Sequence, residues 1–300
     1  MAVNLKTLTE EELFYGAKTC QGCGALMACR MVMKVVGPKS CVAIPACCMA
    51  ATTTVYPQSA IFVNNVVTAF PGLAATIAGM AAGGEAMGWD DDTTYVAFGG
   101  DGGTVDIGIQ GLSGAAERND NILYVCYDNE AYMNTGVQRS GSTPEYCWTT
   151  TTPTGPCSKG EEGQLRKNLL EIMAAHRVPY AATASVAYPM DLLRKVEKAK
   201  AYKGCRVLHI SAPCPTGWGY DPARSVEIGK MAVESGMWYL AEYEDDKLKL
   251  TYRPKALEPV EPYLKCQRRF RHLKPEDIQE IQSVRDQGWE RLAALYEGVR

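Results

Sequence analysis

The chain has 300 residues, of which 46% are hydrophobic and 22% are charged, and its formal net charge is −3. This composition supplies enough apolar residues for a large core, which excludes global disorder. Because no block of basic residues occurs along the chain, nucleic acid is not an expected partner.

Cysteine is abundant and histidine is scarce. The chain has 12 cysteines and only three histidines. Residues 1–12 are polar and acidic, without the apolar core of a signal peptide, so we expect a cytoplasmic protein with reduced thiols. Reduced thiols bind metal, react or pack in the core, and the scarcity of histidine argues against a histidine-based hydrolase.

Short β-rich runs alternate with helical runs along most of the chain. The predicted strands cover residues 41–44, 94–98, 122–127, 180–186 and 206–210. The predicted helices cover 25–36, 72–87, 105–118, 161–176 and 190–202, and another begins at Asp221-Pro222. This alternation predicts an α/β fold, a doubly wound and mostly parallel sheet whose functional loops follow the carboxyl ends of strands.

Two long stretches lie between these elements. Residues 40–84 carry no charge, but three prolines interrupt the run, so we expect buried core and a subunit interface, not a membrane span. Residues 128–159 are expected to form a loop. The helix at 161–176 follows it, with Ser158 and Glu161 spaced as a capping box.

The end of the chain has a different composition. Residues 241–300 hold 24 of the 65 charged side chains, and a closing helix is predicted at 275–295. We therefore expect a domain over residues 1–240 and a C-terminal extension over 241–300. The extension is either a solvated tail or an arm on a partner subunit.

The first motif is a pair of cysteines, Cys20 and Cys23, in the sequence CQGCG. A CxxC before a helix is typical of a redox dithiol, half a zinc site or part of an iron–sulfur site. The polar leader before it disfavours a thioredoxin-type dithiol, and two buried thiols are the bland alternative. The glycines would let both sulfurs face one metal centre.

The second motif is GGDGGT at residues 99–104, between a predicted strand and a predicted helix. Glycines let the backbone approach a phosphate, and a helix N-terminus favours the negative charge. A carboxylate beside a diphosphate is repelled unless a cation lies between them. Asp101 is therefore interpreted as a magnesium ligand, with a tight turn and an Asx cap as the alternative.

The third motif begins at Asp128, 27 residues after Asp101, directly after the next predicted strand. A βαβ crossover of that length would bring Asn129 to the same sheet edge as Asp101. The octahedral shell of magnesium would then consist of the Asp101 and Asn129 side chains, one backbone carbonyl, two diphosphate oxygens and a water. A GDG sequence followed by an asparagine at this distance resembles the signature of thiamine diphosphate enzymes.

Together, these motifs make the chain resemble the β subunits of 2-oxoacid:ferredoxin oxidoreductases, in particular the pyruvate:ferredoxin oxidoreductase (pyruvate synthase) type. The resemblance runs over residues 18–272 and is most specific in CQGCG, GGDGGTVDIG, YDNEAYMNTGVQRSGSTP, HRVPYAATASVAYP and SAPCPTGW. It implies thiamine diphosphate-dependent oxidative decarboxylation of pyruvate in anaerobic metabolism, or the reverse synthesis. Electrons would pass through a 4Fe–4S cluster to ferredoxin, and coenzyme A would take the acyl group.

The resemblance also implies roles for individual residues. The implied cluster ligands are Cys20, Cys23, Cys48 and Cys214, with Cys47 as the alternative to Cys48. The implied magnesium ligands are Asp101, Asn129 and the carbonyl of Ala131. The implied thiamine diphosphate contacts are Cys48, Gly100, Asp101, Gly102, Gly103, Asn129, Ala131, Tyr132 and Asn134.

Two residues are candidates for a catalytic role toward the substrate. Asn134 resembles the residue that faces the thiazolium and the substrate, and Gly136 and Gln138 would shape the same loop. Arg139 is either a second catalytic residue, as partner of the substrate carboxylate, or a surface residue.

The family further implies an obligate hetero-oligomer with alpha, gamma and delta-type subunits, separate or fused, because another subunit supplies the glutamate that activates the aminopyrimidine. Departures from the family pattern at Ala25, 45–48 and 64–71 leave the substrate open. Oxalate, a branched 2-oxoacid, an aryl pyruvate and 2-oxoglutarate are alternatives to pyruvate. A non-catalytic electron-transfer or zinc-binding subunit is the alternative of another class, and it leaves Asp101 and Asn129 unexplained.

Overall fold

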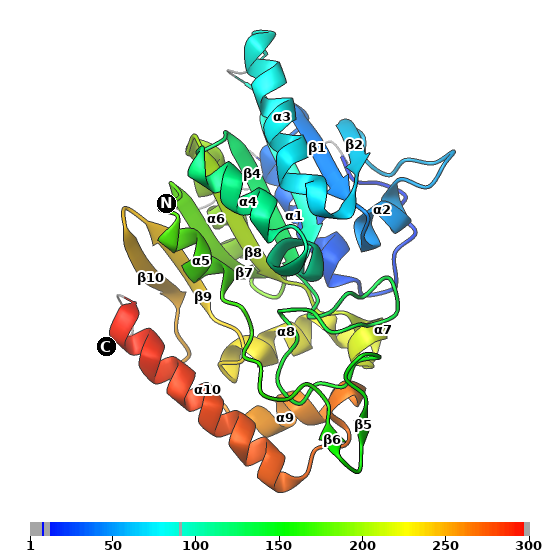
Figure 1. Ribbon diagram of the computed structural model, residues 1–300, viewed down its shortest axis with the longest axis vertical. Helices are drawn as coiled ribbons and strands as arrows, with labels where there is room; N and C mark the ends of the chain where they lie inside the picture. The colour runs from blue at the N-terminus through cyan, green and yellow to red at the C-terminus, as the bar shows by residue number, and fades with distance from the viewer. Residues whose placement is uncertain (1–7, 9–12, 90–91, 297–300) are drawn as a thin grey trace.

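The computed structural model describes residue 8 and residues 13–89 and 92–296. An eight-stranded sheet in the order β10-β9-β7-β8-β4-β3-β1-β2 forms its centre (Figure 1). The expectation for the polar leader, residues 1–12, lies outside the described residues except at Leu8. No helix in the described ranges is long and apolar enough to cross a membrane.

Six neighbouring strands, from β7 to β2 in this order, are parallel, whereas β9 and β10 are antiparallel additions at one edge. Every residue of β4 and β8 is buried, as expected for strands covered on both faces. The bounds are β1 (Ser40–Pro45), β2 (Asn64–Thr68), β3 (Thr94–Gly100), β4 (Ile122–Asp128), β7 (Tyr180–Ser185), β8 (Cys205–Ser211), β9 (Leu240–Glu244) and β10 (Lys247–Tyr252), with a separate hairpin of β5 (Thr154–Gly155) and β6 (Ser158–Lys159).

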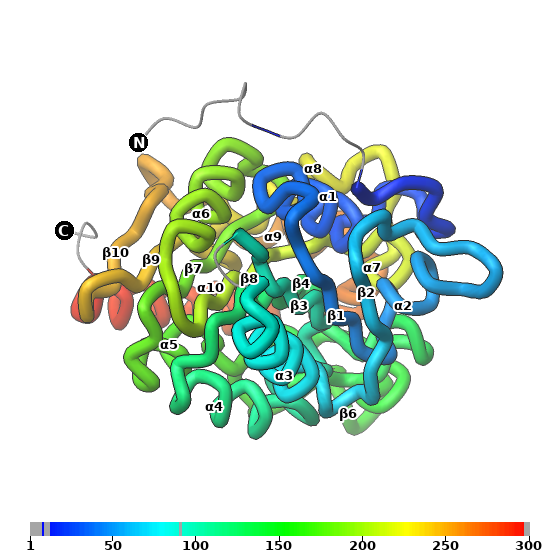
Figure 2. The backbone as a smooth tube through the Cα atoms, turned by 90° about the horizontal axis from the view of Figure 1, so that it is seen from above, coloured from blue at the N-terminus to red at the C-terminus, as the bar shows by residue number. Residues whose placement is uncertain are grey.

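Two groups of helices cover the two faces of the sheet (Figure 2). The helices α1 (Gly24–Val36) and α6 (Pro189–Ala201) pack on one face, where Val32 and Val196 join the strand side chains in one core. On the other face, α3 (Leu73–Ala86), α4 (Ile109–Glu117) and α5 (Leu169–Ala175) form a second core. The predicted doubly wound α/β fold is therefore confirmed.

A third core lies beyond the carboxyl ends of the strands, below the sheet in Figure 1. Its buried aromatic residues include Trp218, Tyr263 and Phe270. The elements around it are α7 (Pro215–Trp218), η4 (Pro222–Arg224), α8 (Ser225–Glu234), α9 (Val260–Lys265), η5 (Arg268–Phe270) and α10 (Pro275–Leu295). This layer closes the sheet edge at which the predicted site residues are expected.

The predicted helix at 161–176 begins too early. In the structure, α5 begins at Leu169, and the Asn168 side chain caps it by accepting from the Glu171 N–H at 3.3 Å. The predicted capping box is wrong because Ser158 lies in the hairpin strand β6. Glu161 is held by tertiary contacts instead, since its backbone pairs with Tyr146 and Cys147.

The predicted helix at 105–118 is divided. A π-helical turn, η3 (Gly102–Asp106), carries the glycine motif, and α4 starts only at Ile109. The predicted final helix, in contrast, is confirmed as α10. The predicted boundary at 240/241 falls at the start of β9, so β9 and β10 of the extension belong to the central sheet. A contact of the extension with a partner subunit stays a prediction.

Lys195 is a fully buried cation that joins α6 to the sheet. Its ammonium group donates to the Thr183 carbonyl at 2.8 Å, to Asp191 Oδ2 at 2.5 Å and to Thr251 Oγ1 at 2.7 Å. Burial lowers the pKa of Lys195 to about 8, although Asp191 opposes this change. The unfolded chain therefore retains this proton to higher pH than the folded chain does.

We expect this difference to appear in the pH dependence of stability. Between about pH 8 and pH 10.4 the unfolded state binds more protons at Lys195, so its contribution to the free energy of unfolding rises with pH. Relative to Lys195→Met, the wild type should gain on the order of 2–3 kcal/mol across this range. Urea unfolding of both proteins at pH 7.5, 9 and 10 measures this gain, and a pH-independent difference would contradict it.

Candidate functional site

A cavity of about 140 Å³ opens at the carboxyl ends of β1, β3 and β4. Its lining comes from the last residues of β3 and β4 and the segments that follow these strands and β1, together with Phe70 from the 3-10 turn η2 (Phe70–Gly72) after β2. Neighbouring parallel strands end at one edge of a sheet, which is why segments far apart in the sequence meet here. The lining includes all nine predicted cofactor contacts, namely Cys48, Gly100, Asp101, Gly102, Gly103, Asn129, Ala131, Tyr132 and Asn134.

Three oxygen atoms face one another at this cavity. The amide oxygen of Asn129 points at two other acceptors, Asp101 Oδ1 and the Ala131 carbonyl oxygen, and lies 3.0 Å from each. In an octahedral magnesium site with bonds of about 2.1 Å, adjacent oxygens are about 3 Å apart. The two distances from the Asn129 amide oxygen therefore match the spacing of adjacent ligands in a magnesium shell. Without a cation, rotation of the amide would relieve the repulsion.

The Asp101 carboxylate is only 1% exposed. It accepts from Ser140 Oγ at 2.5 Å and from the Asn129 N–H at 3.4 Å. Burial, and then the nearby Asp128 carboxylate, raise the pKa of Asp101 well above its usual range. A cation bound to the three oxygens would stabilise the charged form and offset this cost.

The glycine motif is packed between two aromatic rings. A Cβ atom on Gly102 would lie 2.6 Å from the Tyr132 ring, and one on Gly103 would lie 2.7 Å from the Phe70 ring. The Tyr132 hydroxyl also donates to the Gly102 carbonyl at 3.1 Å. Within the described ranges no side chain caps the start of η3, so its first N–H groups remain for an anion.

The predicted cluster cysteines come from three segments at the same edge. Cys20 and Cys23 precede α1, Cys48 begins α2 (Cys48–Thr53), and Cys214 precedes α7. The Gly24 N–H donates to the Pro213 carbonyl at 3.1 Å. A Cβ on Gly24 would lie 2.6 Å from the carbonyl carbon of Ala212, so glycine lets these two backbones touch.

The surroundings of Cys47 and Cys48 differ. Burial raises the pKa of Cys48, and the thiols of Cys214 and Cys23 lie close enough to raise it further. Cys47 instead bonds to the Tyr127 hydroxyl and lies near Cys29, although it is half-buried like Cys48 and also lines the cavity. Cys48 thus lies near two other predicted ligands, and the choice between Cys48 and Cys47 stays a prediction.

Backbone N–H groups donate to two of these sulfurs. Cys23 Sγ accepts from Leu26 at 3.5 Å, and Cys214 Sγ accepts from Gly217 at 3.4 Å. Within the described ranges, no three His, Cys, Asp or Glu side chains lie close enough to hold one metal ion.

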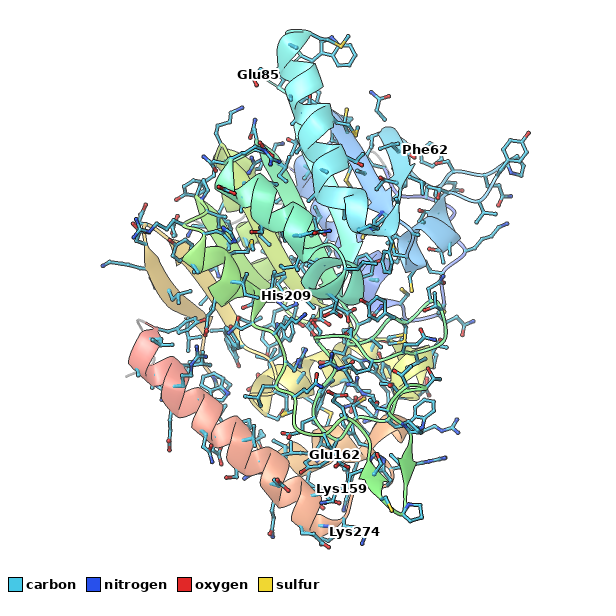
Figure 3. The ribbon with its side chains drawn as sticks, in the orientation of Figure 1. Phe62, Glu85, Lys159, Glu162, His209 and Lys274 are labelled. Carbon is cyan, nitrogen blue, oxygen red and sulfur yellow. The ribbon has the colours of Figure 1, made fainter. Side chains whose placement is uncertain are left out.

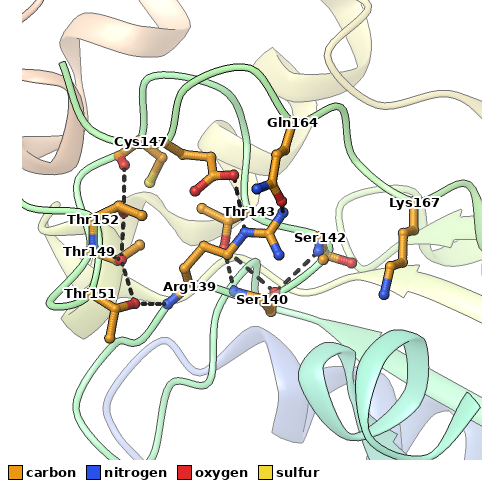
Figure 4. A network of polar contacts seen from close by, with 12 residues as sticks. Arg139, Ser140, Ser142, Thr143, Cys147, Thr149, Thr151, Thr152, Gln164 and Lys167 are labelled. Carbon is orange, nitrogen blue, oxygen red and sulfur yellow. Dashed lines mark hydrogen bonds and ion pairs between the residues drawn. The ribbon is translucent and has the colours of Figure 1, made fainter. Parts of the chain in front are cut away.

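Arg139, a predicted catalytic residue, does not line the cavity. Its guanidinium donates to Glu161 Oε1 at 3.1 Å and to Gln164 Oε1 at 2.5 Å, in the polar network of Figure 4. The structure therefore does not bring Arg139 together with Asn134, which is exposed at the cavity. Gln138 pairs with Tyr132 through both backbone groups and so does shape this loop, as predicted.

Sequence reasoning missed several lining residues, among them Phe70 and Met133. Both are apolar and carry no chemical signal, although the unusual segment 64–71 already pointed to the region of Phe70. Met133 also packs on α7, because a Cβ on Gly217 would lie 2.0 Å from its sulfur. It thus lies between the cavity and the segment of Cys214.

Comparisons with known proteins agree with this geometry. The family described as "Thiamine pyrophosphate enzyme, C-terminal TPP binding domain" matches residues 45–210. Pyruvate synthase subunit PorB of Methanothermobacter thermautotrophicus is 49% identical over 282 residues, covering 94% of this chain and 97% of PorB. Ketoisovalerate oxidoreductase subunit VorB of Pyrococcus horikoshii is 45% identical over 294 residues, covering 96% and 94%.

One solved structure shares the fold. The 2-oxoglutarate:ferredoxin oxidoreductase of Magnetococcus marinus aligns with a TM-score of 0.55 and 20% identity, covering 76% of this chain and 80% of that one. The sequence identities to PorB and VorB extend over nearly the whole length and therefore show the family as well as the fold. The chain belongs to the thiamine pyrophosphate enzymes and, within them, to the β subunits of 2-oxoacid:ferredoxin oxidoreductases, the family of PorB and VorB.

Proposed function

We propose that this β subunit binds magnesium and thiamine diphosphate in the cavity and acts on pyruvate, with coenzyme A and ferredoxin as co-substrates. The convergence of Asp101, Asn129 and Ala131 oxygens carries the proposal, because these oxygens suit a magnesium ion that neutralises a diphosphate. When bound, thiamine diphosphate would supply the reactive carbon that cleaves a 2-oxoacid beside its carbonyl.

The residues of the chain would then bind, orient and shield. Gly100, Gly102 and Gly103 would let the backbone approach the diphosphate, and the Tyr132 and Phe70 rings that pack on Gly102 and Gly103 would hold this turn in place. Asn134, exposed on the lining, would face the substrate.

The choice of pyruvate follows the relatives. The pyruvate synthase subunits of two Methanothermobacter species are 49% and 48% identical to the chain. A branched 2-oxoacid is the second candidate, because ketoisovalerate oxidoreductase subunits reach 45%. A panel of 2-oxoacids, tested for viologen reduction on the co-purified complex, decides between them. If the complex turns over neither pyruvate nor the branched 2-oxoacid, the proposal is overturned.

The magnesium assignment predicts opposite effects of Asp101→Asn on binding and on stability. We expect at least a 100-fold loss of thiamine diphosphate affinity, on the order of 3 kcal/mol, because a metal ligand is removed. The metal-free variant should unfold at the same temperature as the metal-free wild type or higher, because a buried charge is removed. Calorimetric titration and thermal unfolding measure the two effects. Asp120→Asn, in a surface pair with Arg118, is the control.

We assign a 4Fe–4S cluster to Cys20, Cys23, Cys48 and Cys214. The mutual proximity of these thiols and the N–H donors to Cys23 and Cys214 support the assignment. When bound, the cluster would supply a one-electron acceptor beside the cavity.

The two adjacent cysteines allow a matched test of the cluster. Cys48→Ala should lose the iron of this cluster and its visible absorbance, whereas Cys47→Ala should retain about four irons and four sulfides per chain. Iron and sulfide analysis of the anaerobically purified β subunit measures this difference. The reverse pattern would move the third ligand to Cys47, and equal retention in both variants would remove the cluster from this site.

A partner subunit would complete the cavity. Its volume of about 140 Å³ is below the range of about 300–1,000 Å³ typical of pockets that enclose a ligand of cofactor size. Apolar side chains are exposed along the nearby uncharged segment, and Figure 3 shows Phe62 at the edge of the molecule beside β2. This patch consists of Val55, Tyr56, Phe62, Val66 and Val67 of that segment, together with Tyr15, whose ring contacts Phe62.

The exposed apolar patch lies on the strand edge that ends at the cavity. In the described part of the chain, β2 pairs only with β1, so its other edge is open. Both strands end at the cavity, where Ala46 follows β1 and Phe70 follows β2. A subunit with an apolar face that docks on the patch would therefore reach the cavity mouth. We propose that this subunit is the one that supplies the glutamate that activates the aminopyrimidine of the cofactor.

Charge on this patch should separate the subunits. We expect Phe62→Asp to weaken assembly of the oxidoreductase at least tenfold, because a carboxylate would be buried in an apolar contact. Met190→Asp, at the equally exposed start of α6, should leave assembly unchanged. Gel filtration of co-expressed subunits with each variant measures the bound fraction. Normal assembly of Phe62→Asp would place the interface elsewhere.

A further inference from the structure

Trp218 bonds to the backbone of the proposed metal loop. Its side chain is fully buried at the end of α7, and its Nε1–H donates to the Asn129 carbonyl oxygen at 2.9 Å. The pairing of β4 with β8 ends one residue earlier, at Asp128 and Ser211. The indole N–H therefore bonds to the first carbonyl oxygen beyond the paired strands. This bond holds the backbone of Asn129, whose side chain faces Asp101.

The next residue, Glu130, has an uncommon backbone conformation. Its φ angle is +67°, which residues other than glycine rarely adopt, so the surroundings must hold it. The buried Glu130 carboxylate lies 2.5 Å from Arg269 Nη2 and 2.8 Å from Arg166 Nη1. Thr143 Oγ1 donates to the Glu130 carbonyl at 2.8 Å. Glu130 is thus held on both its side chain and its backbone.

Arg269 joins these two contacts. Its guanidinium carbon lies 3.9 Å from the centre of the Trp218 ring while the same group pairs with Glu130. Arg269 is 3% exposed and comes from the turn η5, 139 residues after Glu130 in the sequence. The buried guanidinium therefore fastens the indole and the Glu130 turn to each other, on both sides of the Asn129 carbonyl.

We propose that Trp218 and Arg269 are positioning residues for the metal site, which act by holding the 129–131 backbone so that the Asn129 amide oxygen lies beside both Asp101 and the Ala131 carbonyl. The inference rests on the proposed function, since it assigns these oxygens to magnesium. Outer contacts that orient metal ligands commonly change metal affinity by about 10–100-fold. Neither residue lines the cavity, so both act through the loop and not on the substrate.

Trp218→Phe tests the inference because it removes the N–H donor and keeps an aromatic ring under Arg269. In the co-purified complex, we expect the magnesium concentration for half-maximal thiamine diphosphate binding to rise about tenfold. Manganese binding, followed by electron paramagnetic resonance, should weaken by the same factor. Excess magnesium should restore the maximal rate, since the reacting groups are untouched.

Trp289→Phe is the matched control. Trp289 in α10 also donates its Nε1–H to a carbonyl at 2.9 Å, that of Gly236, away from the cavity. This variant should lose less thermal stability than Trp218→Phe, because Trp289 is only partly buried, and should keep the wild-type metal affinity. Arg269→Lys, which retains the charge but not the planar stacking, should weaken manganese binding in the same direction as Trp218→Phe.

Four results bear on the inference differently. Equal metal affinities of Trp218→Phe and Trp289→Phe would overturn it, as would a rate that stays low in saturating magnesium. Unfolding of Arg269→Lys leaves the comparison of the two tryptophan variants decisive. If the wild-type complex itself binds neither manganese nor thiamine diphosphate, the proposed function fails before the inference is reached.

Discussion

Asp101 holds a carboxylate almost fully away from water, with the Asn129 amide oxygen between it and the Ala131 carbonyl and with Asp128 nearby. An isolated buried anion is costly, and the Ser140 hydroxyl and one backbone N–H offset the cost only in part. A divalent cation would neutralise the carboxylate and would also be attracted by the two neutral carbonyl oxygens. The other features of the site follow from this requirement, because oxygens that repel one another must be held in place before the cation arrives.

The parallel sheet provides that support. Asp101 and Asn129 follow adjacent strands, and Cys48 and Cys214 follow the strands on either side of them, so one edge presents all four. Close backbone approaches bring the rest into contact, since Gly24 lets α1 begin against residues 212–213. The proposed magnesium and cluster sites are therefore neighbours through strand order, without any long connecting element.

Much of this arrangement could be predicted from the sequence, for a physical reason. The positions of Asp101 and Asn129 followed from motifs placed after consecutive parallel strands, a relation that depends only on local pattern and chain length. Glu161 shows the limit of local pattern: it has the spacing of a capping box, but Arg139 takes its carboxylate. Whether Cys47 or Cys48 faces the site depends on the orientation of one turn of α2. Arg269 could not be predicted, because its partner Glu130 lies 139 residues away and the charged C-terminal segment suggested solvent.

The single turn of α7 has a consequence for the resistance of the enzyme to oxygen. It begins after Cys214 and ends at Trp218, so one short helix meets both the proposed cluster and the loop of Asn129. On these assignments, oxidation that destroys the cluster would also free the start of this helix and loosen the tryptophan at its end. Oxygen damage and escape of the organic cofactor would then be a single failure of the enzyme, not two.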